Sequence, residues 1–483
     1  MLDVNWLNFT PPLALLVTAS IGVLFALSQK SSKPTAILSL VGLAVAAGFN
    51  VQLFVRSDAE QLDSFGFRYF ADRPALALNF VIILGTVLAI LISYDYLKRT
   101  DLGHPEYYPL ILLSATGAMI MVAAGDLIVL VLGLEIMSLA VYVLSAWRQN
   151  ARESEEAGMK YFLLGAFASA FLIYGIALMY GATGQFTYFG ISEALTAEGF
   201  SQGLLATLGG VFILGGLGFK AALAPFHQWS PDAYTGAPTS VTAFMSIVVK
   251  AAAFAALVRI FTLIYPDLGV IVTQSFVVLV ALTLIIGNLA ALLQRSVKRL
   301  LAYSAVAHAG YLGLGVLAAN EVGTQALIWY LTAYTLMNAG AFAVLTMISD
   351  KNDHGDDLER FAGLGQKRPW LAAMMTLFLL SLAGIPPFAG FMGKILVFQA
   401  AIQAEYIVLA VIGILTSIVA VIYYFRVIAY MYFREAEYEP LDIRSRATGI
   451  AIGVAAFGTV ALGLLPGWWY GLLSAGRQLI AGL

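Results

Sequence analysis

The sequence predicts an all-α polytopic membrane protein of about fourteen transmembrane helices. Apolar runs of about 20 residues, the length that spans a bilayer as a helix, recur along all 483 residues. The composition is 60% hydrophobic and only 11% charged, with a mean hydropathy of +0.87. No segment is long and polar enough to form a separate soluble domain.

The predicted spans follow one another along the whole chain. They cover approximately residues 11–28, 34–55, 74–97, 107–124, 127–147, 157–180, 203–235, 238–261, 269–292, 300–319, 323–349, 370–403, 406–433 and 447–466. No basic segment precedes the first apolar run, so we expect a retained helix and not a cleaved signal. Asp126 is predicted to cap the fifth span. Residues 185–201 are predicted as a short loop or interfacial turn, and the charged segment 350–369 as a solvated connection.

The composition also excludes several classes of chemistry. The chain has no cysteine, which excludes disulfides, thiol catalysis, Cys-ligated zinc and iron–sulfur clusters. Its 26 basic residues nearly balance 28 acidic ones, so the charge gives no sign of a nucleic-acid partner. The sequence contains neither a P-loop nor an HExxH motif. The GxG at Gly313 to Gly315 lies in an apolar helix and does not follow a strand, so no dinucleotide site is predicted there.

The basic residues outside the spans are distributed unequally between the two sides. Most of them lie in loops that follow odd-numbered spans, whereas the other side carries Arg56, Arg68, Arg73, Arg259 and Arg477. The positive-inside rule therefore places the odd-numbered loops in the cytoplasm and both termini on the periplasmic side.

Five basic residues and one glutamate inside predicted spans are selected as candidates. They are Glu135, Lys160, Lys220, Lys250, Lys394 and Arg426. A charge at the bilayer centre costs about 2.5–3.5 kcal/mol, so several on different helices indicate a polar path through the membrane. Arg426 does not release its proton readily, and we expect it to bind a carboxylate or to extend to the interface.

Prolines interrupt the seventh and twelfth spans close to lysines. Pro225 follows Lys220 by five residues, and Pro386 and Pro387 precede Lys394. Proline breaks the helical hydrogen bonding, and in a membrane the freed carbonyls must be met by protein or water. Such broken helices form ion sites at mid-depth in many transporters, although a proline kink can also serve packing alone.

The positions of the two breaks suggest an internal repeat. Spans four to eight and nine to thirteen are predicted to form two five-helix units of opposite topology. The predicted parts of the chain are thus residues 1–106, 107–263, 264–433 and 434–483.

A lysine and a carboxylate inside the membrane can act as a proton switch. A desolvated lysine exchanges its proton more readily near neutral pH than an exposed one. At about 5 Å and an effective dielectric constant near 20, an ion pair is worth about 3 kcal/mol. Glu135 is predicted to pair with Lys160 or Lys220, or alternatively to form a purely structural ion pair. His227, His308 and Tyr303 are further candidates for proton relay, with packing as their alternative role.

Several long strings resemble a known family. GLEIMSLAVYVLSAW, ESEEAGMKYFLLGAFASAFLIYGIALMYG, GFKAALAPFHQWSPDAYTGAPTSVTAFMSIVVKAAAF, KRLLAYSAVAHAGYLGLG and AGIPPFAGFMGK are similar to the antiporter-like subunits of respiratory complex I. The resemblance covers nearly the whole chain. KYFLLGAFASAF, Lys394 in the twelfth span and the short C-terminal tail resemble the N-type subunits of bacterial proton-pumping NADH:quinone oxidoreductase.

The resemblance implies a role for each candidate residue. Glu135 would pair with a lysine, Lys220 would carry and switch the proton, and Lys160 would match a family lysine in the sixth span. Lys250 and His308 would continue a hydrophilic axis lined by His227 and Tyr303, and Lys394 would serve its exit.

The resemblance also implies the setting of the chain. NADH, FMN, the iron–sulfur clusters and quinone would bind to other subunits, and this chain would hold no cofactor or metal. Its partners would be the antiporter-like M-type subunit, the small K-, J- and A-type subunits and the lipid of a bacterial plasma (inner) membrane.

Other functions fit parts of the sequence. An Mrp-type cation/proton antiporter subunit shares the ancestry, and it would transport sodium or potassium without a dehydrogenase. A hydrogenase- or ferredoxin-linked complex would use another electron donor. A structural membrane scaffold would not require so many buried lysines.

Overall fold

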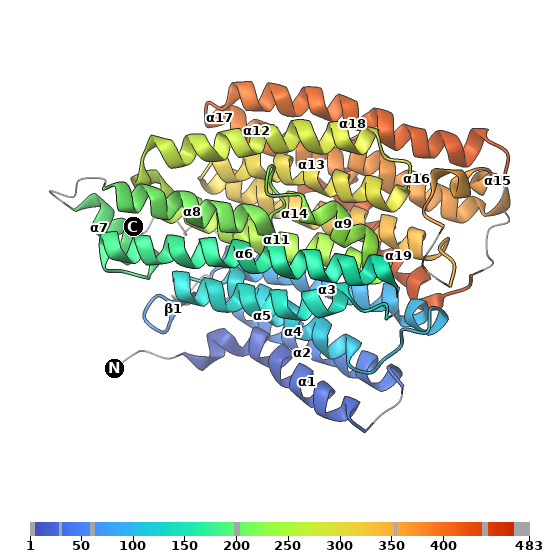
Figure 1. The fold of residues 1–483 in the computed structure, drawn as a ribbon, viewed down its shortest axis with the longest axis horizontal. Coiled ribbons are helices and arrows are strands. Elements are labelled where there is room, and N and C mark those ends of the chain that lie inside the picture. The colour runs from blue at the N-terminus through green and yellow to red at the C-terminus, as the bar shows by residue number, and fades with distance from the viewer. Residues whose placement is uncertain are drawn as a thin grey trace.

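The protein is a bundle of long helices that lie side by side, with their axes close to parallel (Figure 1). A computed structural model describes residues 5–28, 31–57, 63–149, 151–197, 203–351, 353, 355–436 and 443–467. Within these residues, 11 helices are long and apolar enough to cross a membrane. The predicted all-α polytopic fold is therefore confirmed.

The long helices match the predicted spans in order. They are α1 (Thr10–Ala26), α2 (Lys33–Arg56), α3 (Arg73–Arg99), α4 (Tyr107–Val122), α5 (Leu127–Ser145), α6 (Arg152–Thr183), α8 (Leu204–Lys220), α11 (Lys250–Leu263), α12 (Val270–Leu292), α13 (Val297–Leu317), α14 (Glu321–Thr346), α16 (Pro369–Ala383), α17 (Ala389–Gln403), α18 (Ile407–Phe433) and α19 (Arg446–Leu464). The short elements are η1 (Trp6–Phe9), β1 (Asp63–Ser64), β2 (Tyr69–Phe70), α7 (Tyr188–Thr196), α9 (Trp229–Gly236), α10 (Thr239–Phe244), η2 (Met245–Val249), η3 (Tyr265–Leu268), η4 (Leu358–Phe361) and α15 (Leu364–Lys367).

Side-chain caps start many of these helices where the sequence changes from polar to apolar. The carboxylate of Asp126 accepts the backbone N–H groups of Ile128 and Val129 at 2.6 and 3.1 Å, which confirms its predicted N-cap role. Asp72 and Ser296 cap α3 and α13 in the same way. Each cap satisfies N–H groups that the first helical turn leaves free.

The two predicted breaks are present. The seventh span consists of α8 and α9, and the twelfth consists of α16 and α17. The Ala224–Pro225 and Pro386–Pro387 peptide bonds are cis. At the first break, side chains satisfy backbone polar groups by hydrogen bonds. Ala224 donates its N–H to the Thr283 hydroxyl at 2.8 Å, and the Trp229 indole donates to the Phe219 carbonyl at 2.8 Å. The eighth span has its own irregularity, the π-helical turn η2 between α10 and α11.

The helices differ sharply in how much of their surface faces the interior. In Thr239–Leu263 and in α14, the whole of the most apolar stretch is buried, and in α13 the buried share is 94%. In α6 the corresponding share is only 28%. Charged residues on the interior helices are therefore surrounded by protein and not by lipid, which explains how a membrane helix can carry them.

One predicted helix start and two predicted loops differ from the structure. α6 begins at Arg152, before the predicted start at residue 157, because Glu153 and Glu155 in its first turn suit a helix N-terminus. Residues 188–196 form a helix, α7, within the predicted loop. The expectation that 350–369 is simply a solvated connection was wrong, because this segment contains η4 and α15 and buries Asp353.

Candidate functional site

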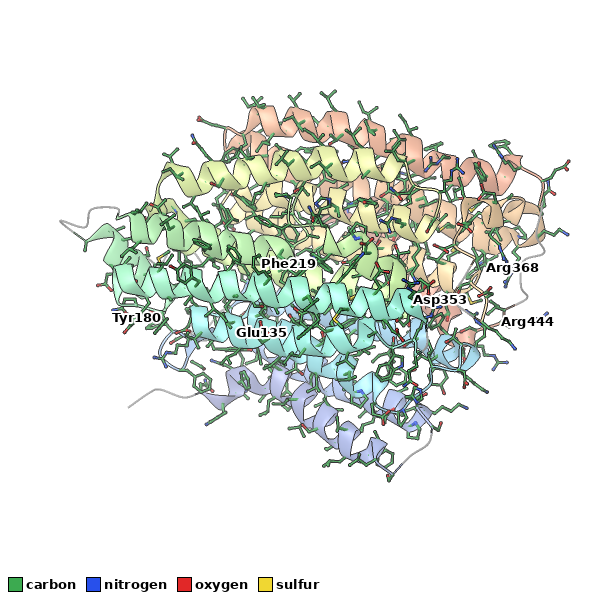
Figure 2. The ribbon with its side chains drawn as sticks, in the orientation of Figure 1. Glu135, Tyr180, Phe219, Asp353, Arg368 and Arg444 are labelled. Atoms are coloured by element: carbon green, nitrogen blue, oxygen red, sulfur yellow. The ribbon has the colours of Figure 1, made fainter. Side chains whose placement is uncertain are left out.

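Three lysines are buried in the interior of the bundle. Lys220, Lys250 and Lys394 are 3%, 2% and 4% exposed, and they come from α8, α11 and α17. Figure 2 shows Phe219, the residue before Lys220, midway along the length of the bundle. No carboxylate lies within ion-pairing distance of any of these three ammonium groups in the described part of the chain. We call these residues the lysine row.

Lys220 is the last residue of α8, directly before the first break. Its Nζ donates to the Tyr142 hydroxyl at 2.9 Å and lies 4.8 and 5.1 Å from the ring centroids of Tyr142 and Tyr161. The C-terminal end of a helix and the faces of aromatic rings both favour a cation. The break therefore gives Lys220 a place where it can be charged without a fixed counter-ion.

Glu135 lies on α5, midway along the bundle and half-buried (Figure 2). It accepts a hydrogen bond from the Ser169 hydroxyl of α6 at 2.6 Å, and it makes no ion pair with either Lys160 or Lys220. Tyr142 follows Glu135 by seven residues, which places both on one face of α5, about 10 Å apart along its axis. The helix face that carries the carboxylate thus also carries Tyr142, which binds Lys220.

Lys160 lies away from the lysine row. Its side chain is 41% exposed and forms ion pairs with Glu156 at 2.6 Å and Asp232 at 2.8 Å. Asp232 also binds Arg299 at 3.1 Å. Sequence analysis missed Asp232, although it is the only acidic residue in the predicted seventh span, a signal that would have found it.

Lys250 and Lys394 both bind backbone carbonyls. Lys250 Nζ donates to Ala305 O at 2.6 Å, directly after the π-helical turn η2. Lys394 Nζ donates to Ala383 O and to the Ser417 hydroxyl, each at 2.8 Å. Because α16 ends at Ala383, the second break supplies the carbonyl that Lys394 binds.

His308 connects these two lysines through aromatic rings. Its ring lies 5.0 Å from that of Tyr334 and 5.7 Å from that of Tyr311. Lys250 Nζ lies 5.9 Å from the Tyr334 ring, and Lys394 Nζ lies 4.8 Å from the Tyr311 ring. The five residues form a continuous buried chain from α11 to α17.

Tyrosine hydroxyls complete the surroundings of His308. Its Nδ1 lies 2.8 Å from the Tyr330 hydroxyl and its Nε2 lies 3.3 Å from that of Tyr424, which also hydrogen-bonds Ser304. Both ring nitrogens therefore have hydroxyl partners that can donate or accept, so either neutral tautomer is accommodated. Sequence analysis did not select these tyrosines, because tyrosine is common in membrane helices.

His227, Tyr303 and Arg426 lie outside this chain of residues. His227 is half-buried beside the exposed Pro225, and its Nδ1 is buried without a hydrogen-bond partner. The ring centroid of Tyr303 lies 5.9 Å from the guanidinium carbon of Arg299. Arg426 binds the carbonyls of Leu292 and Gln294 at 2.9 and 2.5 Å, so it caps the end of α12. Of its two predicted roles, the first, binding a carboxylate, is not the one these contacts show.

Four buried polar atoms near the lysine row have no protein partner. They are the hydroxyls of Tyr161, Ser230 and Tyr334 and the Oδ1 of Asn338. Tyr161 and Tyr334 are the rings that face Lys220 and Lys250, and Asn338 donates to Ser246, four residues before Lys250. Buried polar groups are normally hydrogen-bonded, often to internal water, so this region is suited to hydration.

Metal chemistry has no support in the described residues. Within them, no group of three or more histidine, aspartate or glutamate side chains could hold a metal ion, and the sequence has no cysteine. Neutral hydroxyls, carbonyls and aromatic faces surround the lysines, and of these groups the hydroxyls can both accept and donate a proton.

Comparisons with known proteins agree with this geometry. A family model described as NADH:quinone oxidoreductase/Mrp antiporter, TM matches residues 124–420, which include Glu135 and the lysine row. The chain is 43% identical to NADH-quinone oxidoreductase subunit N of Trichlorobacter lovleyi over 440 residues, covering 91% of this chain and 89% of the relative. It is 40% identical to subunit N of Chloroflexus aggregans over 483 residues, covering 99% and 98%.

Solved structures share the fold. A chain of respiratory complex I from Thermus thermophilus matches with a TM-score of 0.81 and 37% identity, covering 95% of this chain and 97% of that one. A chain of the Mrp complex from a Dietzia species matches with a TM-score of 0.84 over 98% of this chain and 97% of that one, but at 22% identity this likeness shows the fold alone. The chain belongs to the subunit N family of NADH-quinone oxidoreductase, within the NADH:quinone oxidoreductase/Mrp antiporter transmembrane family.

Proposed function

We propose that this chain is a proton-translocating membrane subunit of an NADH:quinone oxidoreductase and that its lysine row carries the protons. One observation carries the proposal: three lysines are buried in interior helices, and neutral hydroxyls, carbonyls and aromatic rings surround them in place of carboxylates. A lysine without a fixed counter-ion can release and regain its proton as nearby charges move. A charged residue inside a membrane protein carries a free-energy cost of insertion, and such residues usually mark a functional site.

Glu135 is the proposed control on Lys220. In the present arrangement its partner is the Ser169 hydroxyl, and Tyr142, on the same helix as Glu135, binds Lys220. Movement of the carboxylate toward the lysine would stabilise the ammonium by about 3 kcal/mol at about 5 Å. Moving one charge against 100 mV costs about 2.3 kcal/mol, so the pair energy is of the size that proton pumping requires.

The other candidate residues receive roles from their positions. Lys250 and His308 would pass the proton along the aromatic chain toward Lys394, which would release it. Lys160, with Asp232, would form a charged cluster that adjusts the field at the first break. His227 and Tyr303 would line the approach to this axis, with less direct contact than His308.

The setting follows from the family. We place NADH, FMN, the iron–sulfur clusters and quinone on other subunits, because this chain offers no cysteine and no phosphate-binding loop. The partners would be the M-type and the small K-, J- and A-type membrane subunits of the complex. The chain would lie in a bacterial inner membrane with both termini periplasmic.

The division of the chain into parts is also a proposal. Residues 107–263 and 264–433 would form two five-helix units of opposite topology, preceded by residues 1–106 and followed by 434–483. In support, α4 packs along α5 as α12 packs along α13, and each unit has one broken helix. An Mrp-type antiporter or a hydrogenase-linked complex would share this architecture, but the relatives from Trichlorobacter lovleyi and Chloroflexus aggregans, at 43% and 40% identity, are both subunit N.

The direct test is Lys220→Ala in the intact complex. We expect proton pumping and coupled quinone reduction to fall at least about tenfold, because removing a proton-transfer group typically costs 10²- to 10⁴-fold. The amount of assembled complex should stay close to normal. Lys33→Ala, at an exposed lysine, is the matched control and should change neither activity.

Two results would contradict the proposal. Normal pumping by the assembled Lys220→Ala complex would remove Lys220 from the proton path. Purification of the tagged chain without flavin or NADH:quinone activity, but with sodium transport, would favour the antiporter function instead.

A further inference from the structure

A buried ion pair lies outside the lysine row. Lys298, near the start of α13, binds Asp353, which follows α14, at 3.0 Å, and the two side chains are only 2% and 1% exposed. Figure 2 shows Asp353 at the same end of the bundle as Arg368 and Arg444 and away from Glu135. The pair therefore belongs neither to the solvated surface nor to the centre of the proton path.

Both members of the ion pair form hydrogen bonds to one turn of the backbone. Lys298 Nζ also donates to Ala237 O at 2.8 Å. The Asp353 carboxylate accepts from the Thr239 N–H at 3.0 Å and from the Thr239 hydroxyl at 2.8 Å. Residues 237–239 link α9 to α10, so these three hydrogen bonds from α13 and the segment after α14 fix the turn.

The turn connects the surroundings of Lys220 with Lys250. On one side, Trp229 of α9 stacks on Tyr161 at 4.2 Å and donates to the Phe219 carbonyl, directly beside Lys220. On the other side, α10 and η2 lead to Lys250 over 11 residues, about 16 Å of helix. A displacement of the turn would therefore move both ends of the path between the two lysines.

The segment that carries Asp353 is itself anchored to α13. Val297 donates its N–H to Asp356 O at 2.6 Å, and Leu358 donates to Arg295 O at 2.9 Å. Asp353 is thus presented to the turn by a segment fixed on the same helix that carries Lys298. At Gly236, a Cβ atom would lie 2.1 Å from Glu153 O, so the end of α9 also packs directly against the start of α6.

A buried ion pair is poor evidence for stability. Desolvation of both charges offsets most of their attraction, and replacing such a pair with apolar residues is often neutral. The two charges here instead bind the Ala237 carbonyl and the Thr239 N–H of one turn. Their arrangement therefore serves to fix the position of that turn.

We propose that Asp353 is a positioning residue for proton transfer: with Lys298 it holds the α9–α10 turn and thereby sets the path between Lys220 and Lys250. This inference rests on the proposed function of the lysine row. Asp353 does not itself carry the proton, because its carboxylate is already occupied by donors from Lys298 and Thr239.

The experiment compares graded substitutions in the intact complex. Asp353→Asn keeps an oxygen that can accept from Thr239, whereas Asp353→Ala removes it. Likewise Lys298→Arg keeps a donor for Ala237 O, whereas Lys298→Met does not. The readouts are the amount of assembled complex, the rate of coupled NADH:quinone turnover and the number of protons pumped per NADH oxidised.

The expected result is a graded loss. Asp353→Ala and Lys298→Met should lower coupled turnover at least about tenfold in assembled complex, because a misplacement of about 1 Å can cost 10²-fold. Asp353→Asn and Lys298→Arg should each keep most of the turnover. Arg259→Met is the matched control, because Arg259 makes two 2.8 Å bonds to Asp72 that join α11 to α3, and its loss should lower assembly without changing protons per NADH.

Two outcomes would overturn the proposal. One is normal turnover and pumping by assembled Asp353→Ala. The other is an Asp353→Asn variant as impaired as Asp353→Ala, which would mean that the negative charge acts and not its hold on the turn. If Asp353→Ala fails to assemble, Lys298→Met against Lys298→Arg makes the same comparison. Full activity of Lys220→Ala would instead contradict the proposed function. It would not contradict the conclusion that Lys298 and Asp353 fix the position of the α9–α10 turn.

Discussion

At the scale of single residues, the buried lysines are stabilised by dipoles and rings. Lys220 has a hydroxyl and two aromatic faces, and Lys250 and Lys394 have carbonyls. These partners support the ammonium without neutralising it. A carboxylate bound in the same place would hold the proton on the lysine, and the lysine could then not act as a carrier.

The contact between Lys220 and Tyr142 gives a specific prediction. Tyr142→Phe removes the hydroxyl at 2.9 Å but keeps the ring, so the charged form of Lys220 should lose about 1.5–3 kcal/mol of stabilisation. We expect the proton-pumping rate to fall about tenfold while assembly stays normal. Pumping by vesicles that contain the reconstituted complex is the measurement.

The control for this prediction lies on α6. Tyr174 is 57% exposed, so Tyr174→Phe should leave pumping unchanged. Equal pumping by the Tyr142→Phe and wild-type complexes would show that the ring alone supports Lys220.

Sequence reasoning succeeded for residues whose chemistry is local and failed where partners are distant. The lysines and prolines of the two breaks were identified because each stands out in an apolar stretch. The pairing of Lys160 with Asp232 was not, because it depends on how α6 is rotated against α9. Burial of Asp353 was missed for the same reason, since its partner Lys298 lies 55 residues away.

At the scale of helices, the broken spans depend on close backbone approach. Gly390, in the first turn of α17, lies so close to α16 that a Cβ atom would be 1.9 Å from Ser381 O. Its N–H also binds the Ser381 hydroxyl at 3.1 Å. The two halves of the twelfth span are therefore joined by contacts that leave no room for a side chain, which places Lys394 beside the Ala383 carbonyl.

Gly390→Ala should separate these halves. Overpacking of this kind typically costs 1–3 kcal/mol, so the midpoint of thermal unfolding of the complex and the yield of assembled subunit should both fall. Gly453→Ala is the control, because no atom lies within 4 Å of a Cβ built there. Equal thermal stability of the two variants would show that α17 can move away from α16 without loss.

At the scale of the whole molecule, the hydropathy pattern specified the order of the spans but not which helices are interior. Helices α6 and α14 are both long and apolar enough to cross a membrane, yet the most apolar stretch of the first is mostly exposed and that of the second is fully buried. That difference arises from contacts between distant parts of the chain, such as those of α14 with α3 and α19. The interior helices are the ones that carry Lys250 and His308, so the site could be placed only once the packing was known.

The orientation of the bundle is the remaining whole-molecule prediction. The basic loops are expected in the cytoplasm, because positively charged loops are retained there during insertion. Since the chain has no cysteine, single substitutions can report the side directly. Lys33→Cys and Lys351→Cys, both at exposed positions, should react with a membrane-impermeant maleimide only in inside-out vesicles, and Phe67→Cys, at a residue 48% exposed, only in intact spheroplasts. The reverse pattern would invert the direction in which Lys394 releases protons, and the roles proposed for the two breaks would have to be exchanged.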